Sequence, residues 1–307
     1  MAQASAQTIR TTKPGKRTDW EKVALSVSFL GLPIVFLALF NYYPALKLFQ
    51  LSFTDWDGMS ADYSYVGWRN FRELLGDSSV LQALLNTLAY VAAMLIQTAV
   101  ALYLAIVLDG KLRAKNGFKS IISLPFILNG VAVIYMFNLL YDGQFGPLNA
   151  LLKLAGLGPV EWLPHSYGIN VSLAFMGVWK NTGFAMIIFL GALQSIPRDI
   201  YEAAEIDGAH YFQRIRYISI PSIVLILELN LFLGLNGAMQ AYQESFIMYP
   251  AGSPGSIAET LMTKTLNTAF KFSQFGKASA LAVMLMLFIL TIVLLQRLIL
   301  KEKEETA

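Results

Sequence analysis

Six long apolar runs constrain this chain more than any other feature of its sequence. They cover residues 23–43, 80–108, 121–141, 171–193, 218–238 and 278–300. A helix rises about 1.5 Å per residue, so roughly 20 apolar residues cross the hydrocarbon core of a bilayer. We therefore predict an all-α, polytopic membrane helical bundle with about six transmembrane helices. The fifth run is the weakest, because it contains Glu228, Asn230 and Asn236.

The composition excludes several other classes of protein. With 56% hydrophobic and 14% charged residues, the chain is too apolar for a soluble surface. Its Lys and Arg are scattered between the apolar runs, so it offers no basic face for nucleic acid. It has no Cys and two distant His, which excludes thiol chemistry and zinc sites built from Cys or clustered His. We expect no metal site.

The distribution of positive charge predicts the topology. Fifteen Lys and Arg fall before the first run, in the second and fourth connections, or at and beyond the end of the sixth run, and seven fall in the other connections. Because Lys and Arg resist translocation, both termini are predicted to be cytoplasmic in a multi-pass cell-membrane protein. Residues 1–22 are predicted to be a flexible tail, residues 23–300 the membrane domain and residues 301–307 a second tail. The Gly and Pro cluster at 250–255 predicts a tight turn.

The fourth connection, residues 195–221, carries the most information about function. Pro197 suits a first helical turn, Asp199 and Glu202 suit its positive end, and Gly208 can end a helix. This pattern predicts two short helices that meet at the glycine. The loop also carries more apolar side chains than a solvated loop should, namely Ile200, Ala203, Ala204, Tyr211, Phe212 and Ile215. The residues alone fit either a protein partner or a loop folded back on its own helix ends.

The same segment resembles the EAA loop of binding-protein-dependent ABC importer permeases. Six residues fall at the spacing of that motif: Glu202, Ala203, Ala204, Gly208, Ile218 and Pro221. The one departure is Ile220, where the family usually has Leu. The resemblance implies that the residues coupling the chain to an ATPase are Glu202, Ala203, Ala204, Asp207 and Gly208.

The resemblance covers nearly the whole chain and points to the maltose and glycerol-phosphate branch of these permeases. It rests on LSFTDWDG (51–58), VGWRNF (66–71), NTLAYV (86–91), SLPF (123–126), FGPLNALL (145–152), GALQSIP (191–197) and FGKASALAV (275–283). It implies a type I ABC importer permease fold in a prokaryotic inner or plasma membrane. The implied partners are a second permease chain as heterodimer, two ATP-binding subunits, a solute-binding protein and a carbohydrate solute.

No catalytic motif accompanies this resemblance. The sequence contains no G-x-x-x-x-G-K-[ST], HExxH or GxSxG pattern. We therefore expect a transport subunit that catalyses no reaction and binds no cofactor, with ATP and Mg²⁺ held by the partner ATPase subunits.

Polar residues inside the spans predict where a solute passes, because they tend to face the bundle interior or a watery cavity. In the fourth run, Trp179, Lys180, Asn181 and Phe184 combine rings, a cation and an amide that suit a sugar. The resemblance places these positions and Phe126 on the sugar pathway. Trp179 could instead anchor at the interface, and Lys180 could extend to it or pair with an acid.

The fifth run has a small, polar face around Asn230 at about 100° per residue. The resemblance places sugar contacts at Gly234, Gly237, Ala238 and Ala241, and Glu244 falls on the same side if the helix continues. The alternative is that this face packs closely against another helix. Glu228 falls on the opposite side, so we predict that it does not line the cavity. It lies about ten residues from each end of the predicted helix, so we expect it near mid-membrane, at a contact with a neighbouring helix or the partner permease.

Other transporters and enzymes remain as alternatives. An ABC permease for another solute, such as a glycerol phosphodiester or a peptide, would carry the same loop. An ion-coupled secondary transporter could use Glu228 and Lys180, and would work without an ATPase. A membrane-embedded enzyme is disfavoured by the lack of a catalytic motif.

Overall fold

The computed structural model describes residues 20–110, 112–163, 168–249 and 257–304. The turn predicted at 250–255 and most of the N-terminal tail lie outside these residues. The described chain is helical apart from loops and one isolated antiparallel bridge between Thr54 and Tyr65. It forms two compact units, which meet in sequence between Lys47 and Leu48.

The first unit contains α1 (Trp20–Leu37), a π-helical turn (Ala38–Tyr42) and the start of α2 (Tyr43–Leu51). Helix continues from Val27 to Leu51, long and apolar enough to cross a membrane. The rings of Phe36 and Phe40 stack, with centroids 5.9 Å apart. These side chains are exposed, as expected for a helix that lies in lipid.

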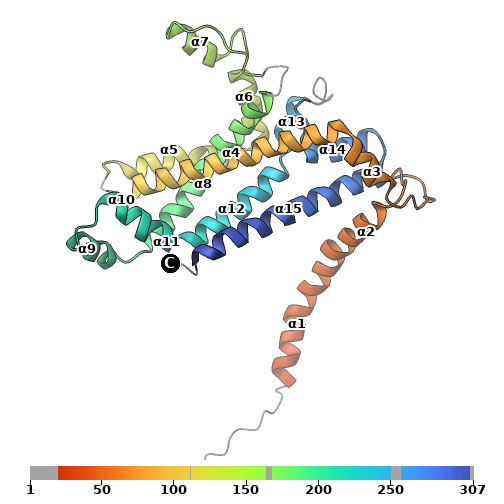
Figure 1. The fold of residues 1–307 in the computed structure, drawn as a ribbon, viewed down its shortest axis with the longest axis horizontal. Helices are drawn as coiled ribbons and strands as arrows, with labels where there is room; N and C mark the ends of the chain where they lie inside the picture. Colours follow the sequence, from red (N-terminus) through yellow and green to blue (C-terminus); the bar gives the residue numbers. More distant parts are fainter. Residues whose placement is uncertain (1–19, 111, 164–167, 250–256, 305–307) are drawn as a thin grey trace, which may run out of the picture. The chain divides into compact units, whose positions relative to one another are not determined.

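The second unit is a bundle built around long helices. Its larger elements are α3 (Arg69–Gly76), α4 (Ser78–Asp109), α5 (Lys115–Ile127), α6 (Gly130–Leu140), α7 (Pro147–Leu154), α8 (Ile169–Gln194), α9 (Arg198–Ile206), α12 (Val224–Met239) and α15 (Phe275–Glu304). Shorter ones are α10 (Tyr211–Arg214), a π turn (Ile215–Ser219), α11 (Ile220–Ser222), α13 (Gln243–Met248), α14 (Leu261–Leu266) and a second π turn (Asn267–Lys271). Helix α8 packs between α4 and α5, and α12 packs on α4 and α15 (Figure 1).

Five helical segments are long and apolar enough to cross a membrane, or six if one bent pair counts as a span. The prediction of about six spans in an all-α bundle is therefore confirmed. The predicted runs at 80–108, 171–193 and 278–300 agree with α4, α8 and α15 to within a few residues. Helix α15 continues to Glu304, beyond the predicted end of the membrane domain.

The third run differs from the prediction of one straight helix over residues 121–141. Helices α5 and α6 are bent by 101° at a break between Ile127 and Gly130. Leu128 is extended, and the side chain of Asn129 accepts a hydrogen bond from the Val131 backbone N–H at 2.9 Å. Asn129 therefore acts as the N-cap of a new helix.

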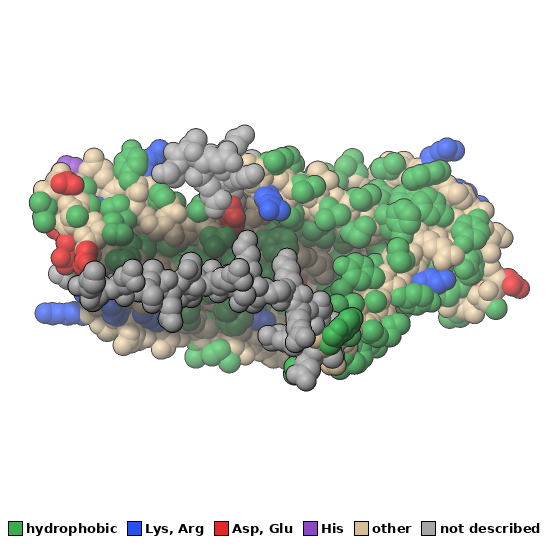
Figure 2. Space-filling model, turned by 90° about the horizontal axis from the view of Figure 1, so that it is seen from below, with side chains coloured by type: hydrophobic (Ala, Val, Ile, Leu, Met, Phe, Trp, Pro, Cys, Tyr) green, Lys and Arg blue, Asp and Glu red, His purple; other side chains and the backbone are tan. Residues whose placement is uncertain are grey.

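Small side chains of α4 pack with large side chains of α8 in the main helix contact of the bundle. Ala101 and Ala105 of α4 are completely buried in one cluster with Met186 and Phe189 of α8. Small residues of this kind let membrane helices approach closely. Hydrophobic side chains also predominate on the outside, as the face in Figure 2 shows, which is the arrangement that lipid requires.

The contact between α5 and α8 depends on Gly183. A Cβ added there would collide with the Ile122 carbonyl and with Ser123 Cα, which are backbone atoms. We expect Gly183→Ala to lower the free energy of unfolding by about 1–3 kcal/mol through overpacking, read as a lower midpoint of thermal unfolding in detergent. Gly191→Ala is the matched control, because no atom lies within 4 Å of an added Cβ on the same helix. Equal midpoints for the two variants would contradict this close approach.

Candidate functional site

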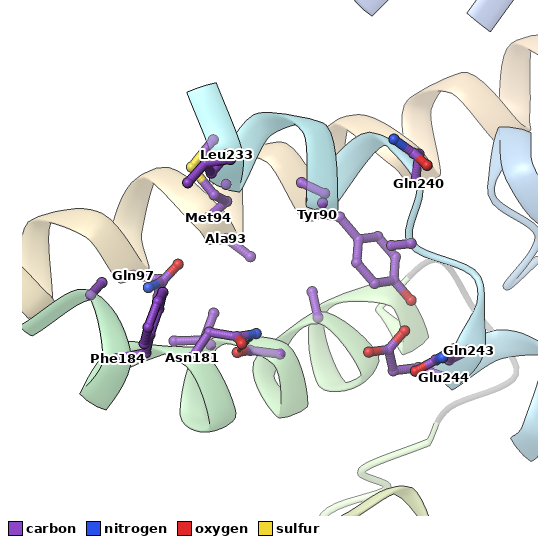
Figure 3. A pocket seen from close by; sticks show the side chains of 18 of the residues that line it. Tyr90, Ala93, Met94, Gln97, Asn181, Phe184, Leu233, Gln240, Gln243 and Glu244 are labelled. Carbon is purple, nitrogen blue, oxygen red and sulfur yellow. Dashed lines mark hydrogen bonds between the residues drawn. The ribbon is translucent and has the colours of Figure 1, made fainter. Parts of the chain in front are cut away.

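A cavity of about 500 Å³ lies within the second unit, between α4, α8 and α12. Tyr90, Met94 and Gln97 reach it from α4, and Asn181 and Phe184 reach it from α8 (Figure 3). Phe126 of α5 closes part of the wall and stacks on Phe184, with ring centroids 4.3 Å apart. The wall is therefore mostly apolar with a few polar groups, which is the usual construction of a small-molecule site.

The structure brings together eight of the ten residues that were predicted to line a pathway. They are Phe126, Asn181, Phe184, Asn230, Gly234, Gly237, Ala238 and Ala241. Gly234 also packs closely on α4, since an added Cβ would lie 2.9 Å from Met94 Cγ. Gly237 has no atom within 4 Å of that position, so it leaves open space in the cavity. The small face of α12 thus serves both close packing and the cavity wall.

Trp179 and Lys180 lie outside the lining of this cavity. The Trp179 ring packs edge-on against Phe137 of α6, with centroids 5.4 Å apart. The Lys180 side chain extends toward the start of α6, where its Nζ would lie 3.4 Å from a Cβ on Gly130. The break in the third run explains the positions of both residues. Helix α6 turns across α8 and occupies the space that Trp179 and Lys180 face.

Five polar lining residues were missed by the sequence reasoning: Tyr90, Gln97, Gln240, Tyr242 and Gln243. A signal for two of them was present, because Tyr90, Met94 and Gln97 follow one another at helical spacing along α4. Their run, residues 80–108, was treated as uniformly apolar and was not searched for polar residues on one face. Gln240, Tyr242 and Gln243 gave no such signal, since they lie where α12 ends and α13 begins.

The helix formed by the fifth run is shorter than predicted and starts later, at Val224. Helix α12 begins at Val224 and ends at Met239, so Ala241 and Glu244 reach the cavity from the following turn and α13. Glu228 lies near the start of α12, and the expectation of a mid-helix position is wrong. It is absent from the described lining of the cavity, and its backbone carbonyl accepts a hydrogen bond from Gln296 of α15 at 3.2 Å.

The segment at residues 257–260 holds one wall of the cavity in place. Asn86 of α4 and Asn170 of α8 both donate to the Ile257 carbonyl, at 2.7 and 2.9 Å. Thr260 donates to the Ala241 carbonyl at 2.6 Å. Because Ala241 lines the cavity, these bonds fix the turn between α12 and α13 relative to α4 and α8.

The two predicted short helices of the fourth connection are present. Helices α9 and α10 are joined at Gly208, whose φ of +81° favours glycine. We call residues 197–214 the elbow. It lies at the end of the bundle opposite to α3 and α14 (Figure 1).

The elbow is anchored on one side and exposed on the other. The Tyr201 hydroxyl lies 3.0 Å from Ser219 Oγ, and Arg214 pairs with Glu205 at 3.1 Å. Of the apolar side chains expected at the surface, those of Ile200, Ala203, Tyr211 and Phe212 are exposed, and those of Ala204 and Ile215 are half-buried. Ile206 was missed and is 87% exposed. Glu202 is exposed on α9, and Asp207 and Gly208 are exposed in the turn that follows it.

A folded loop, residues 52–67, lies at the opposite end of the bundle. Asn70 donates to the carbonyls of Ser52 and Thr54, at 2.9 and 2.8 Å. Hydrogen bonds from the backbone N–H groups of Ser60 and Met59 lower the pKa of Asp57 to about 2. The loop therefore presents a fixed carboxylate at ordinary pH.

Comparison with known proteins gives one family and full-length relatives. Residues 97–304 match the family described as "Binding-protein-dependent transport system inner membrane component". The "Probable ABC transporter permease protein YurN" of Bacillus subtilis is 31% identical over 90% of this chain and 96% of that protein. The "Diacetylchitobiose uptake system permease protein NgcF" of Streptomyces coelicolor is 29% identical over 88% of this chain and 80% of that protein.

Solved structures share the fold. A chain from the crystal structure of a bacterial alginate ABC transporter, in complex with an alginate pentasaccharide-bound periplasmic protein, aligns with a TM-score of 0.81 at 22% identity. The alignment covers 93% of this chain and 97% of the other. The likeness extends over nearly the whole bundle.

Proposed function

This chain belongs to the binding-protein-dependent transport system inner membrane component family, and from that premise we propose that it is the permease subunit of an ATP-driven importer of a carbohydrate. The observation that carries the proposal is the cavity between α4, α8 and α12. Aromatic faces at Phe126 and Phe184 suit the CH faces of a sugar, and the amides of Asn181 and Asn230 suit its hydroxyls. Relatives named as permeases for diacetylchitobiose and for arabinooligosaccharides support this class of solute.

We propose that the elbow of this chain contacts one of two ATP-binding subunits, and that the other subunit binds a second permease chain. The elbow's exposed Tyr211, Phe212 and Ile206 leave apolar surface that a protein partner would cover. Glu202, Ala203, Ala204, Asp207 and Gly208 are the proposed coupling residues. In this scheme both termini are cytoplasmic, ATP and Mg²⁺ bind the partner subunits, and this chain catalyses no reaction.

A solute-binding protein is proposed to deliver the sugar at the other end of the bundle. The folded loop at 52–67 lies there, and a hydrogen bond of 2.8 Å from the Gly276 N–H to the Trp56 carbonyl ties it to the start of α15. A loop tied to a transmembrane helix in this way can pass a docking event to the bundle.

Asn181 gives a direct test of the proposed pathway. Its side-chain N–H donates to Gly177 of its own helix at 2.9 Å, which holds the amide at the cavity wall. We expect Asn181→Ala to raise the half-saturation concentration for sugar uptake about 3- to 10-fold, the effect of one lost hydrogen bond. Uptake of labelled oligosaccharides by cells that express the complete importer measures it. Asn116→Ala, an exposed position on α5, is the control; identical uptake curves for both variants would remove Asn181 from the pathway.

A further inference from the structure

The cavity has a polar end and a less polar end. Tyr90, Gln240, Gln243 and Glu244 gather at one end, where the Tyr90 hydroxyl and the Glu244 carboxylate point toward one another (Figure 3). Met94, Leu233 and Phe184 lie toward the other end, together with the Gln97 amide. A solute with one polar group and one apolar face would therefore bind in one orientation.

Tyr90 supplies a polar atom that lacks a partner. The residue is 7% exposed, and its buried hydroxyl makes no hydrogen bond within the described residues. A buried hydroxyl without a partner costs free energy, so such groups in native proteins usually meet a ligand, an ion or water. The hydroxyl points toward the Glu244 carboxylate (Figure 3), so a hydroxyl or amine of a solute that enters this end of the cavity can complete its hydrogen bonding.

Glu244 supplies the charge at the same end. It is the only carboxyl among the described lining residues, and no Lys or Arg is among them. The nearby cation is Lys180, whose Nζ lies near Gly130 together with Gln243 Oε1, outside the lining. Lys180 therefore adds no charge to the described lining, and Glu244 supplies the charge that a solute meets at this end.

We propose that the Tyr90 and Glu244 end of the cavity admits uncharged and cationic hydroxylated solutes and rejects anionic ones such as uronates. The proposal rests on the proposed function and adds to it the charge class of the solute. A carboxylate accepts hydrogen bonds from sugar hydroxyls and attracts an ammonium. It repels a second carboxylate, and the repulsion is stronger in a membrane-embedded cavity than in water because the effective dielectric constant is lower.

Because the chain has no cysteine, the charge preference of the cavity can be measured with introduced thiols, without knowing the solute. Gly237→Cys places a thiol in the cavity where an added Cβ meets no atom within 4 Å, and Asn181→Cys provides a second position. Each variant, as the full chain in native membranes, is treated with a cationic and an anionic methanethiosulfonate reagent of similar size. We expect the ratio of the cationic to the anionic reaction rate to exceed the ratio for a free small thiol by about 10-fold.

Three further substitutions test whether Glu244 causes the difference between the two reaction rates. Glu244→Gln removes the charge with little change of shape, and should bring the ratio within about 2-fold of the free thiol. Tyr90→Phe removes a neighbouring hydroxyl without changing the charge, and Glu161→Gln removes an exposed carboxylate outside the lining. Both should leave the ratio as in the parent cysteine variant.

The outcomes separate this inference from the proposed function. A ratio that Glu244→Gln leaves unchanged, a preference for the anionic reagent, or no reaction at either cysteine would overturn the charge selectivity. Sugar uptake by the cysteine-free importer is measured in the same cells. ATP-dependent uptake without a charge preference overturns only the present inference, whereas a charge preference without such uptake overturns the proposed function.

Discussion

Substituting Gly208 by valine in the assembled importer is expected to lower solute-stimulated ATP hydrolysis and uptake together, by about 10-fold or more. Gly208 has a φ of +81°, which a β-branched residue rarely adopts, so valine would change the angle between α9 and α10. Glu202→Lys should act in the same direction, because it reverses a charge on the exposed side of α9. Both changes disturb the proposed contact while the bundle itself is left alone.

Matched controls separate loss of coupling from loss of folding. Gly156 has a φ of +75° and no atom within 4 Å of an added Cβ, so Gly156→Val imposes the same backbone strain far from the elbow in sequence. Glu161→Lys reverses an exposed charge in the loop after α7. Both controls should retain activity and assembly. Normal ATP hydrolysis and uptake in Gly208→Val and Glu202→Lys would show that the elbow does not couple the two subunits.

A bulky side chain at Gly237 is expected to block the pathway. An added Cβ there meets open space, so the Gly237→Trp side chain can extend into the cavity of about 500 Å³ without first displacing backbone. We expect uptake to fall below about a tenth of wild type, because the indole would occupy the space that a sugar needs. The purified complex should still assemble and hydrolyse ATP.

The control for this variant is Leu225→Trp on the same helix. Leu225 is exposed and lies outside the described lining of the cavity, so a larger ring there should be accommodated. Uptake of labelled oligosaccharides by cells that express each complete importer gives the comparison. Full uptake by Gly237→Trp would mean that the solute passes elsewhere.

The long helices could be predicted because their sequence signal is local. A run such as residues 80–108 has no competing structure in a bilayer, where each backbone group must find a partner within its own helix. Helices α4, α8 and α15 accordingly begin and end within a few residues of the predicted runs. The elbow could be predicted for the same reason, since Pro197 and Gly208 determine its ends locally.

The break between α5 and α6 could not be read from hydropathy. Residues 121–141 are mostly apolar, and the exceptions are too few to exclude a straight span: Ser123, Pro125, Asn129, Gly130 and Asn138. Hydropathy does not predict that Asn129 caps the next helix or that α6 then turns across α8. This turn removes Trp179 and Lys180 from the described cavity wall, although they stand next to Asn181 in sequence.

The polar end of the cavity depends on tertiary structure in a similar way. Ala241 and Glu244 were placed on one long helix, yet α12 ends at Met239 and a turn held by Thr260 brings them to the wall. Tyr90 and Gln97 lie on the same side of α4, but only the position of α8 and α12 shows that this side meets a cavity. Periodicity gives the face of a helix, and packing decides what that face meets.

The most direct test of the account is the side of the membrane on which the elbow lies. Glu202→Cys introduces the only thiol of the chain, at an exposed position of α9. A membrane-impermeant maleimide should label it in inside-out vesicles, leave it unlabelled in intact cells, and label it less once the ATP-binding subunits are added. Labelling from the outside of intact cells would contradict a cytosolic elbow, and with it the transmission of ATP-driven movement into this bundle.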